Sequence, residues 1–322
     1  YLNYALWGII MIGMIHPISF IIRNHPLEYI YFNEVIGGIK NANGKYEIDY
    51  SLNSLKLTSD WLIENVIVDY EGSDKLIIAT NDNLTTGHYL RKYKDKTIVK
   101  YVRYYERGNI DWDYAMFYSS LTSPNQIQNG YFPPKNSIYT VDVDGAEIAA
   151  LLKRKNKYDF QGAQAMNKNQ PDLAIHLLEK AYQLDNANEA VILNLVQLYT
   201  VTGRYKDAER MIYRGMEVYP EWNHLMSAYG DLSLRQNQVE KALAVFRELI
   251  KTNDKYYTAY YKVGYIFFMK NDFNKASAYA DRCLMYNGEY KPAYYLKAEA
   301  LRKLGQPEEA QRYIDYANKN LK

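Results

Sequence analysis

The chain has 322 residues, with 39 basic and 37 acidic side chains and a formal net charge of +2. Neither half carries the dense basic face that nucleic-acid binding usually needs, so we expect no nucleic-acid partner. A single cysteine, Cys283, excludes an intrachain disulfide framework and a cysteine-rich zinc site. The length favours two or three domains. The first residue is Tyr1 rather than Met, so we expect a fragment or a processed product.

An uncharged apolar run lies near the start of the chain. Its sequence, ALWGIIMIGMIHPISFII, covers residues 5–22. As a helix it would be roughly 27 Å long, about the thickness of the hydrocarbon core of a bilayer. We therefore predict a membrane-spanning helix within residues 1–24, which Pro17 would kink or end. A basic leader and a small-residue cleavage site, the marks of a signal peptide, are not visible. The alternative is a helix buried in a soluble core.

Residues 25–154 have mixed periodicity, which predicts a small α/β domain. Amphipathic spacing predicts a helix over SLKLTSDWLIENV and a second helix over NLTTGHYLRKY. Strands are expected at KLIIAT, TIVKYVRYYER and YAMFYSS. The segment SIYTVDVDGAEIAALLKR is typical of a β-hairpin with Asp144-Gly145 as its two-residue turn. The inward-facing residues of the first helix would be Leu55, Trp61, Leu62 and Val66.

No sequence motif in the chain indicates catalysis. Asp111 and Asp113 would face the same side of a strand, but a solvated or hydrogen-bonded role is favoured over a catalytic carboxylate pair. Asp142 and Asp144 precede a glycine, yet the rest of a calcium loop is missing. The H-E-x-x-H, G-x-S-x-G, Walker and G-x-G-x-x-G patterns are also missing. We therefore assign no catalytic residue, no metal ligand and no cofactor.

The C-terminal half has an internal repeat of constant length. Alanine recurs at one unvarying interval, at Ala174, Ala208, Ala242, Ala276 and Ala310. Five residues before each alanine stands Asn or Gly, which tolerates the left-handed conformation that ends a helix. Twelve residues before each alanine stands Gly, Val or Ala, which allows two helices to cross closely. Cys283 occupies a small-residue position and is expected in the core. The pattern predicts five helix–turn–helix repeats that begin near Lys155, Glu189, Asn223, Tyr257 and Lys291.

These repeats resemble the tetratricopeptide repeat (TPR) family, which has the same period of roughly 34 residues. The resemblance covers residues 155–322 and is close in GRYKDAERMIYRGMEVYP. It implies an all-α superhelix that binds a protein or peptide and does not catalyse. Family members usually bind through the second, fifth, ninth and twelfth positions of each first helix. On or beside these positions lies the inner stripe, which comprises Gln197, Asp231, Arg235, Tyr261, Tyr265, Glu299 and Arg302. The alternative is a solvated face with scattered tyrosines. The whole chain is thus expected to be an α+β multi-domain protein.

The segment that follows the apolar run resembles a second family. Its residues in order are His25-Pro26, Tyr31-Phe32-Asn33, Val35, Gly37-Gly38, Ala42, Gly44, Glu47 and Tyr50. This order is similar to the stretch after the last membrane helix in bacterial glycosyltransferases of the protein O-mannosyltransferase and aminoarabinose-transferase type. Ser51 departs from the family pattern, where Trp is expected. The resemblance covers residues 1–154.

The second resemblance implies an enzyme of the bacterial inner membrane that takes a sugar from a polyprenyl-phosphate carrier. The family's catalytic acid lies in an earlier loop that this chain does not contain, so these residues are expected to be non-catalytic. Their soluble part would lie on the extracytoplasmic side. Tyr29, Tyr31 and Phe32 would lie at the membrane interface, where aromatic rings are common, or alternatively in the α/β core. The competing hypothesis is a membrane-tethered TPR adaptor without enzymatic activity.

Overall fold

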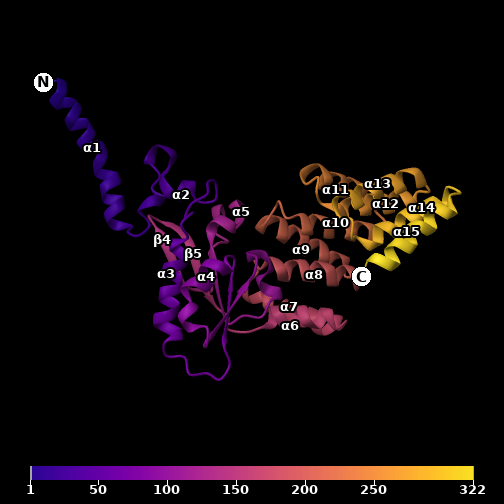
Figure 1. The fold of residues 1–322 in the computed structure, drawn as a ribbon, viewed down its shortest axis with the longest axis horizontal. Coiled ribbons are helices and arrows are strands. Elements are labelled where there is room, and N and C mark those ends of the chain that lie inside the picture. The colour runs from indigo at the N-terminus through magenta and orange to yellow at the C-terminus, as the bar shows by residue number, and fades with distance from the viewer. Residues whose placement is uncertain (1, 322) are drawn as a thin grey trace. The chain divides into compact units, whose positions relative to one another are not determined.

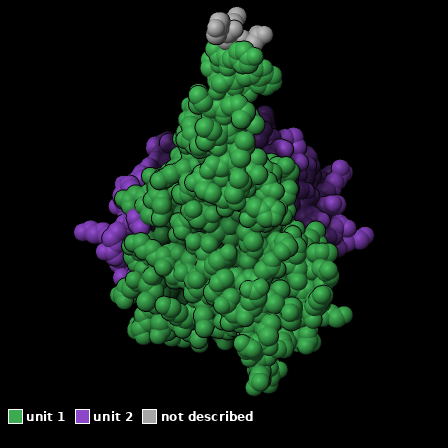
Figure 2. Space-filling model, turned by 90° about the vertical axis from the view of Figure 1, so that its left-hand side faces the viewer, with its two compact units in different colours: residues 1–194, 217–220 green, residues 195–216, 221–322 purple. Residues whose placement is uncertain are grey.

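The computed structural model describes residues 2–321, and the chain divides into two compact units (Figure 2). Unit 1 consists of Tyr1–Asn194 and Glu217–Pro220, and unit 2 of Leu195–Met216 and Glu221–Lys322. The chain is mostly helical, with a small mixed sheet and one apolar N-terminal helix, which fits the expected α+β class. The first helical repeat belongs to unit 1, so position 154 marks a change of fold type inside that unit.

The sheet of unit 1 contains β1 (Leu76–Thr80), β2 (Thr97–Tyr101), β3 (Tyr114–Tyr118), β4 (Ser137–Val143) and β5 (Ala146–Lys153). Their order is β2-β1-β3-β5-β4. Strand β1 is parallel to β2 and β3, whereas β5 is antiparallel to β3 and β4. Asp144 and Gly145 join β4 to β5 with φ values of 46° and 82°, and positive φ at both residues is what a type I′ turn requires. The predicted hairpin is confirmed.

One face of the sheet is covered by the helices that the sequence predicts. Helix α3 (Asn53–Leu62) continues into the π-helical turn η3 (Ile63–Ile67), and α4 (Asn83–Tyr89) is followed by η4 (Arg91–Tyr93). Leu55 and Leu62 are fully buried in the core under this face, and Trp61 and Val66 pack against it while partly exposed. The amphipathic reading of α3 is confirmed.

The opposite face of the sheet differs from the sequence expectation. The predicted strand TIVKYVRYYER ends at Tyr101, and a 3-10 turn, η5 (Tyr104–Asn109), follows it. The reason is packing, because the Tyr104 ring lies edge-on at 5.2 Å from Phe117 and leaves the alternation of a strand. The short elements η6 (Ser119–Leu121) and α5 (Pro124–Gln128) follow β3 and were not predicted.

Helix α1 (Leu2–Arg23) projects from the rest of unit 1 (Figure 1). Its stretch Tyr4–Arg23 is long and apolar enough to cross a membrane, judged by length and composition alone. Only 6% of its apolar window is buried, so the described residues do not enclose it in a core, which was the alternative. Of the two expected effects of Pro17, a kink or an end, the end does not occur, because the helix continues through this residue.

Polar contacts tie the foot of α1 to unit 1. Arg23 Nη2 lies 3.2 Å from Asp144 Oδ2 in the β4–β5 turn, and His16 Nε2 lies 3.1 Å from Glu34 Oε1. The chain then runs through η1 (Glu28–Ile30), η2 (Glu34–Ile36) and α2 (Gly38–Ala42). Gly37 joins η2 to α2 with a φ of 87°, a left-handed conformation that favours glycine.

The predicted repeats are helix pairs. The pairs are α6 (Tyr158–Asn167) with α7 (Pro171–Leu184), α8 (Glu189–Val201) with α9 (Tyr205–Val218), α10 (Asn223–Arg235) with α11 (Val239–Thr252), α12 (Tyr257–Met269) with α13 (Phe273–Tyr286), and α14 (Lys291–Lys303) with α15 (Pro307–Asn320). All five periodic alanines have no exposed surface. The residues that end the first helices have positive φ, as expected, and they are Asn169, Gly203, Asn237, Asn271 and Gly305.

Small residues at the helix crossings are required by the space available. A Cβ added to Gly162 would lie 2.5 Å from Leu178 Cγ, and one added to Gly230 would lie 2.4 Å from Phe246 Cζ. Real Cβ atoms do not approach other atoms so closely. Cys283 is fully buried, and burial raises the pKa of its thiol to about 12, so its expected role in the core is confirmed.

A first prediction tests the packing at these crossings. Ala242→Arg should place an unpaired charge in the core and lower the free energy of unfolding by about 3–5 kcal/mol. Ala244 is exposed on the same helix, so Ala244→Arg is a matched control that should change stability by less than about 0.5 kcal/mol. Urea unfolding of both variants measures the difference. Equal midpoints for the two would contradict the packing described.

Candidate protein-binding surface

The inner stripe lies on the first helices of repeats two to five, α8, α10, α12 and α14. All seven of its side chains have solvent-exposed surface. Asp231 and Tyr261 are half-buried, and the exposed members are Gln197, Arg235, Tyr265, Glu299 and Arg302. Their role in binding stays a prediction, but each side chain can be reached by a partner.

Four tyrosines from α12 and from the turn before α14 form a continuous aromatic surface. This tyrosine cluster consists of Tyr257, Tyr261, Tyr265 and Tyr290. The rings of Tyr261 and Tyr265 are stacked, with centroids 6.5 Å apart and planes inclined by 25°. The ring of Tyr290 lies edge-on to Tyr257 at 5.1 Å and to Tyr261 at 5.4 Å. The base of the cluster is half-buried, whereas Tyr265 is 43% exposed at its open end.

Two hydroxyl groups of the cluster, those of Tyr261 and Tyr290, stay neutral near physiological pH. Burial, with a further contribution from Tyr265, raises the pKa of Tyr261. Burial also raises the pKa of Tyr290 to about 12, and Tyr261 adds to that shift. A neutral phenol both donates and accepts a hydrogen bond. The cluster therefore offers apolar ring surface together with hydroxyls that suit either the N–H or the carbonyl groups of a peptide.

Charged residues flank the tyrosine cluster. Lys262 Nζ on α12 lies 2.6 Å from Asp231 Oδ1 on α10, which links two neighbouring repeats. Arg302 Nη1 donates to Glu299 Oε1 at 2.6 Å on α14. Arg235 is the last residue of α10, roughly 12 Å further along its helix than the position equivalent to Tyr261. A ligand that contacts both Arg235 and Tyr261 must therefore span about this distance along the array.

Sequence reasoning missed three tyrosines near this surface. Tyr257 opens its repeat and Tyr290 lies in a turn, so neither falls on the expected binding positions. Tyr295 does fall on the fifth position of α14, as Tyr261 does on α12, and equal offsets would have identified it. Tyr295 is 38% exposed and its hydroxyl donates to Asn318 Oδ1 at 2.8 Å. The aromatic surface is thus wider than the sequence alone indicated.

The three rings expected at a membrane interface lie near the foot of α1. Tyr29, Tyr31 and Phe32 are half-buried and pack against the core of unit 1. The Tyr31 ring lies edge-on at 5.2 Å from Phe20 of α1, and the Tyr29 hydroxyl donates to the buried carboxylate of Asp49. These contacts give the rings a structural role in unit 1, and their position relative to a bilayer stays a prediction.

A buried ionic network joins the sheet of unit 1 to the end of its first repeat and to the start of α8. Arg107 of η5 donates to Glu189 at the start of α8, and its Nη2 donates to Asp185 Oδ2 at 3.2 Å. Glu189 also accepts from the side-chain amide of Gln126. Arg107 and Glu189 are only 2% and 1% exposed. Burial opposes the charge on Arg107, but Glu189 together with Tyr104 and Asp185 outweighs burial and raises the pKa of the guanidinium.

A second prediction concerns this network. Arg107→Ala would leave the buried Glu189 carboxylate without its partner and should destabilise unit 1 by about 3–5 kcal/mol. Arg91 is exposed in the same unit, so Arg91→Ala is the control and should have an effect below about 0.5 kcal/mol. Adding Glu189→Leu to the Arg107→Ala chain should recover part of the loss. Chemical denaturation followed by circular dichroism measures all three, and a loss that Glu189→Leu deepens would refute the account.

The other acidic residues considered for chemistry have structural partners. Asp113 Oδ2 accepts from the backbone N–H of Ile77 at 2.8 Å, and Asp111 Oδ1 lies 2.8 Å from Lys157 Nζ. This is the hydrogen-bonded role that the sequence favoured over a catalytic pair. Among residues 2–321, no group of three or more His, Cys, Asp and Glu side chains could hold a metal ion.

Comparison with known proteins identifies the repeats. Residues 165–229 and residues 292–317 each match a family described as tetratricopeptide repeat. No curated protein gives a significant match. Among solved structures, PilW, a widely conserved type IV pilus biogenesis factor, is 22% identical with a TM-score of 0.44, over 49% of this chain and 73% of PilW. PilF of Pseudomonas aeruginosa is 17% identical with a TM-score of 0.45, over 50% of this chain and 73% of PilF. A thermophilic TPR protein of Thermus thermophilus is 17% identical with a TM-score of 0.44, over 49% of this chain and 86% of that protein.

The family matches lie within the helix pairs described above, and those pairs have the family's period, turns and small crossing residues. The C-terminal part of this chain is therefore a tetratricopeptide array, and such arrays mediate protein–protein interaction.

Proposed function

We propose that the repeats bind a protein or peptide through the inner stripe, with Tyr261 and Tyr265 as the main anchors. The observation that carries this proposal is the tyrosine cluster. In it the half-buried ring of Tyr261 packs against Tyr290 and holds the exposed ring of Tyr265 in a fixed orientation. Aromatic side chains that are already ordered lose little conformational entropy on binding. Arg235, Asp231, Gln197, Glu299 and Arg302 would supply directional contacts on either side of the rings.

A third prediction follows for the anchors. Truncation of an aromatic anchor in a desolvated pocket usually costs about 2 kcal/mol or more. The double change Tyr261→Ala, Tyr265→Ala should therefore weaken binding of the partner by more than about tenfold while helicity is unchanged. A photoreactive phenylalanine analogue at position 265 identifies the partner by crosslinking in native membranes. Titration of the purified partner then gives the change in Kd.

The control for this experiment is Tyr213→Ala, because Tyr213 is 54% exposed on α9, the second helix of its repeat. It should leave the Kd within about twofold of the unchanged chain. Full-strength binding by the Tyr261→Ala, Tyr265→Ala chain would refute the inner stripe as the binding surface.

We also propose that α1 anchors the chain in the bacterial inner membrane, with the soluble part on the extracytoplasmic side. A fourth prediction tests the anchor. The chain should sediment with membranes and need detergent for extraction, because the apolar surface of α1 is exposed. A chain that begins at Ser19 keeps Phe20, which is buried in the core of unit 1, and should be recovered in the soluble fraction. If both chains are soluble without detergent, the anchor is wrong.

The finer proposal is that these residues form the non-catalytic C-terminal part of a membrane glycosyltransferase that uses a polyprenyl-phosphate sugar donor. Support comes from the motif after the apolar run, in which Asn33 accepts from the N–H of Ile36 at 3.3 Å and Gly37 and Gly38 have φ values of 87° and 63°. These residues build a specific turn at the foot of α1. The alternative is a membrane-tethered TPR adaptor with no enzymatic activity.

The coding sequence upstream of Tyr1 distinguishes these alternatives. Many further apolar spans and an acidic residue in the first extracytoplasmic loop would support the glycosyltransferase. A start codon directly upstream would support the adaptor and overturn the glycosyltransferase. Neither result bears on peptide binding by the repeats, which the tyrosine variants test separately.

A further inference from the structure

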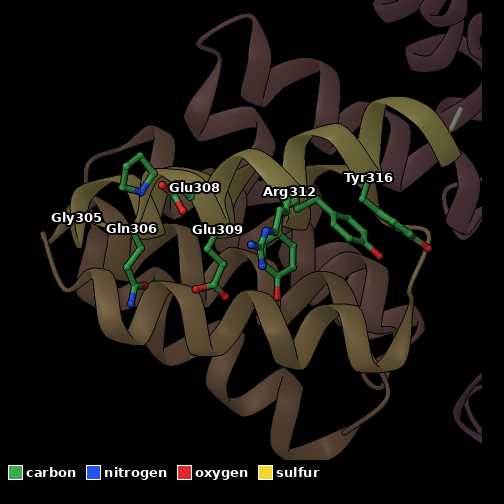
Figure 3. A pocket seen from close by; sticks show the side chains of 9 residues that line it. Gly305, Gln306, Glu308, Glu309, Arg312 and Tyr316 are labelled. Atoms are coloured by element: carbon green, nitrogen blue, oxygen red, sulfur yellow. The ribbon is translucent and has the colours of Figure 1, made fainter.

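A groove with a volume of about 810 Å³ lies on the last repeat, along α15 and the turn that precedes it (Figure 3). Its aromatic lining is Tyr294 of α14 with Tyr313 and Tyr316 of α15, and its polar lining includes Glu308, Glu309 and Arg312. Tyr294 and Tyr316 are stacked with centroids 5.3 Å apart, and Tyr316 is 49% exposed. In a repeat array each repeat buries its hydrophobic face against a neighbour, so an aromatic groove that is open to solvent calls for an explanation.

The preceding repeat shows what covers the equivalent surface. Tyr260 and Tyr279 stand one repeat period before Tyr294 and Tyr313. Tyr260 shares a core cluster with Ala293 of α14, and Tyr279 packs in a cluster that contains Ala300 of the same helix. Helix α14 therefore lies on the face of repeat four that corresponds to the groove on repeat five.

The charges at the two ends of this face repeat as well. Lys270, just after α12, pairs with Glu240 of the preceding repeat, and Lys297 of α14 pairs with Asp281 of the preceding repeat. Glu308 stands two periods after Glu240, and Asp315 stands one period after Asp281. Glu308 and Asp315 thus occupy positions that elsewhere in the array hold a lysine of the next first helix. Both are exposed on α15.

We propose that this groove binds an amphipathic helix of a partner protein with the pattern small-x3-Lys-x2-apolar-x3-Lys. The small residue corresponds to Ala293, the first lysine to Lys297, the apolar residue to Ala300, and the last lysine to the repeat position of Lys270. These spacings of three and four residues place all four side chains on one side of a helix. The aromatic floor accepts the small and apolar residues, while Asp315 and Glu308 each pair with a lysine. This surface is separate from the inner stripe, so the inference goes beyond the proposed function.

The probe is a capped peptide with the sequence of residues 290–305, YKPAYYLKAEALRKLG, and the change Leu304→Lys, which completes the pattern. Fluorescence anisotropy with the full chain in detergent should show saturable binding. The double change Glu308→Lys, Asp315→Lys should weaken binding by about tenfold, because both salt bridges become repulsive. A peptide with Glu at positions 297 and 304 should restore affinity for this double variant. Glu248→Lys, an exposed reversal on α11, is the control and should have no effect.

Three results would overturn the proposal. The double reversal could behave like Glu248→Lys, which would remove the acidic anchors. The Tyr261→Ala, Tyr265→Ala chain could lose the peptide, which would place the peptide in the inner stripe. Sedimentation velocity could show a dimer that Tyr316→Arg dissociates, which would make a second copy of this chain the occupant of the groove. Normal peptide binding by the Tyr261→Ala, Tyr265→Ala chain would instead support the groove, whatever that variant does to the other partner.

Discussion

Close contact between paired helices is the constraint on which the repeat array depends. Gly230 has no side chain, and the ring of Phe246 on the following helix fills the space beside it. Gly162 and Leu178 form the same arrangement with the same separation along the chain. A methyl group at either glycine would collide with a side chain that is itself fully buried and has no room to move. In these two helix pairs, the pairing of a glycine with a large residue therefore fixes how the helices pack.

The rigidity of the pairs is what gives the surface residues their positions. Tyr257, Tyr261 and Tyr265 lie at intervals of four residues on α12, and α12 is held by Val263 and Ile266, both fully buried. Ala293, three residues after Tyr290, is fully buried and so fixes the start of α14. Tyr290 is thereby held against the same cluster. A looser core would allow these rings to adopt many orientations, and the entropy of ordering them would oppose binding. The packed core of the array therefore favours binding, because it holds the tyrosine rings in fixed orientations.

The buried network around Arg107 works by a different physical principle. Removing two charges from water is unfavourable, and their attraction offsets this only when the remaining polar atoms also find partners. Arg107 satisfies this condition, because its side chain also donates to Tyr104 O at 3.0 Å and lies 4.2 Å above the Tyr104 ring. An apolar cluster tolerates many arrangements, whereas this network accepts only the one in which Glu189 and Asp185 face η5. We take its role to be specifying how the end of the first repeat and the start of α8 attach to the sheet.

The sequence was most informative where structure repeats and least informative where residues meet over long separations. The constant repeat period located every helix pair, and the Asn and Gly positions identified the turns, because each rests on local backbone and packing rules. Arg107 and Glu189 are 82 residues apart in the chain, and no local pattern indicates that they pair. The strand predicted through Arg107 was wrong beyond Tyr101, because burial of Tyr104 and Arg107 outweighed the alternation that the sequence displays.

The groove on α15 was missed for a related reason. A single repeat shows which residues are aromatic or acidic, but only the contacts of the preceding repeat, such as Lys297 with Asp281, show which of them face a neighbouring helix. The role that we propose for Glu308 and Asp315 therefore rests on the sequence period together with the structure. Exposed ion pairs contribute little stability, and at this groove they would serve mainly to select which helix binds and in which register.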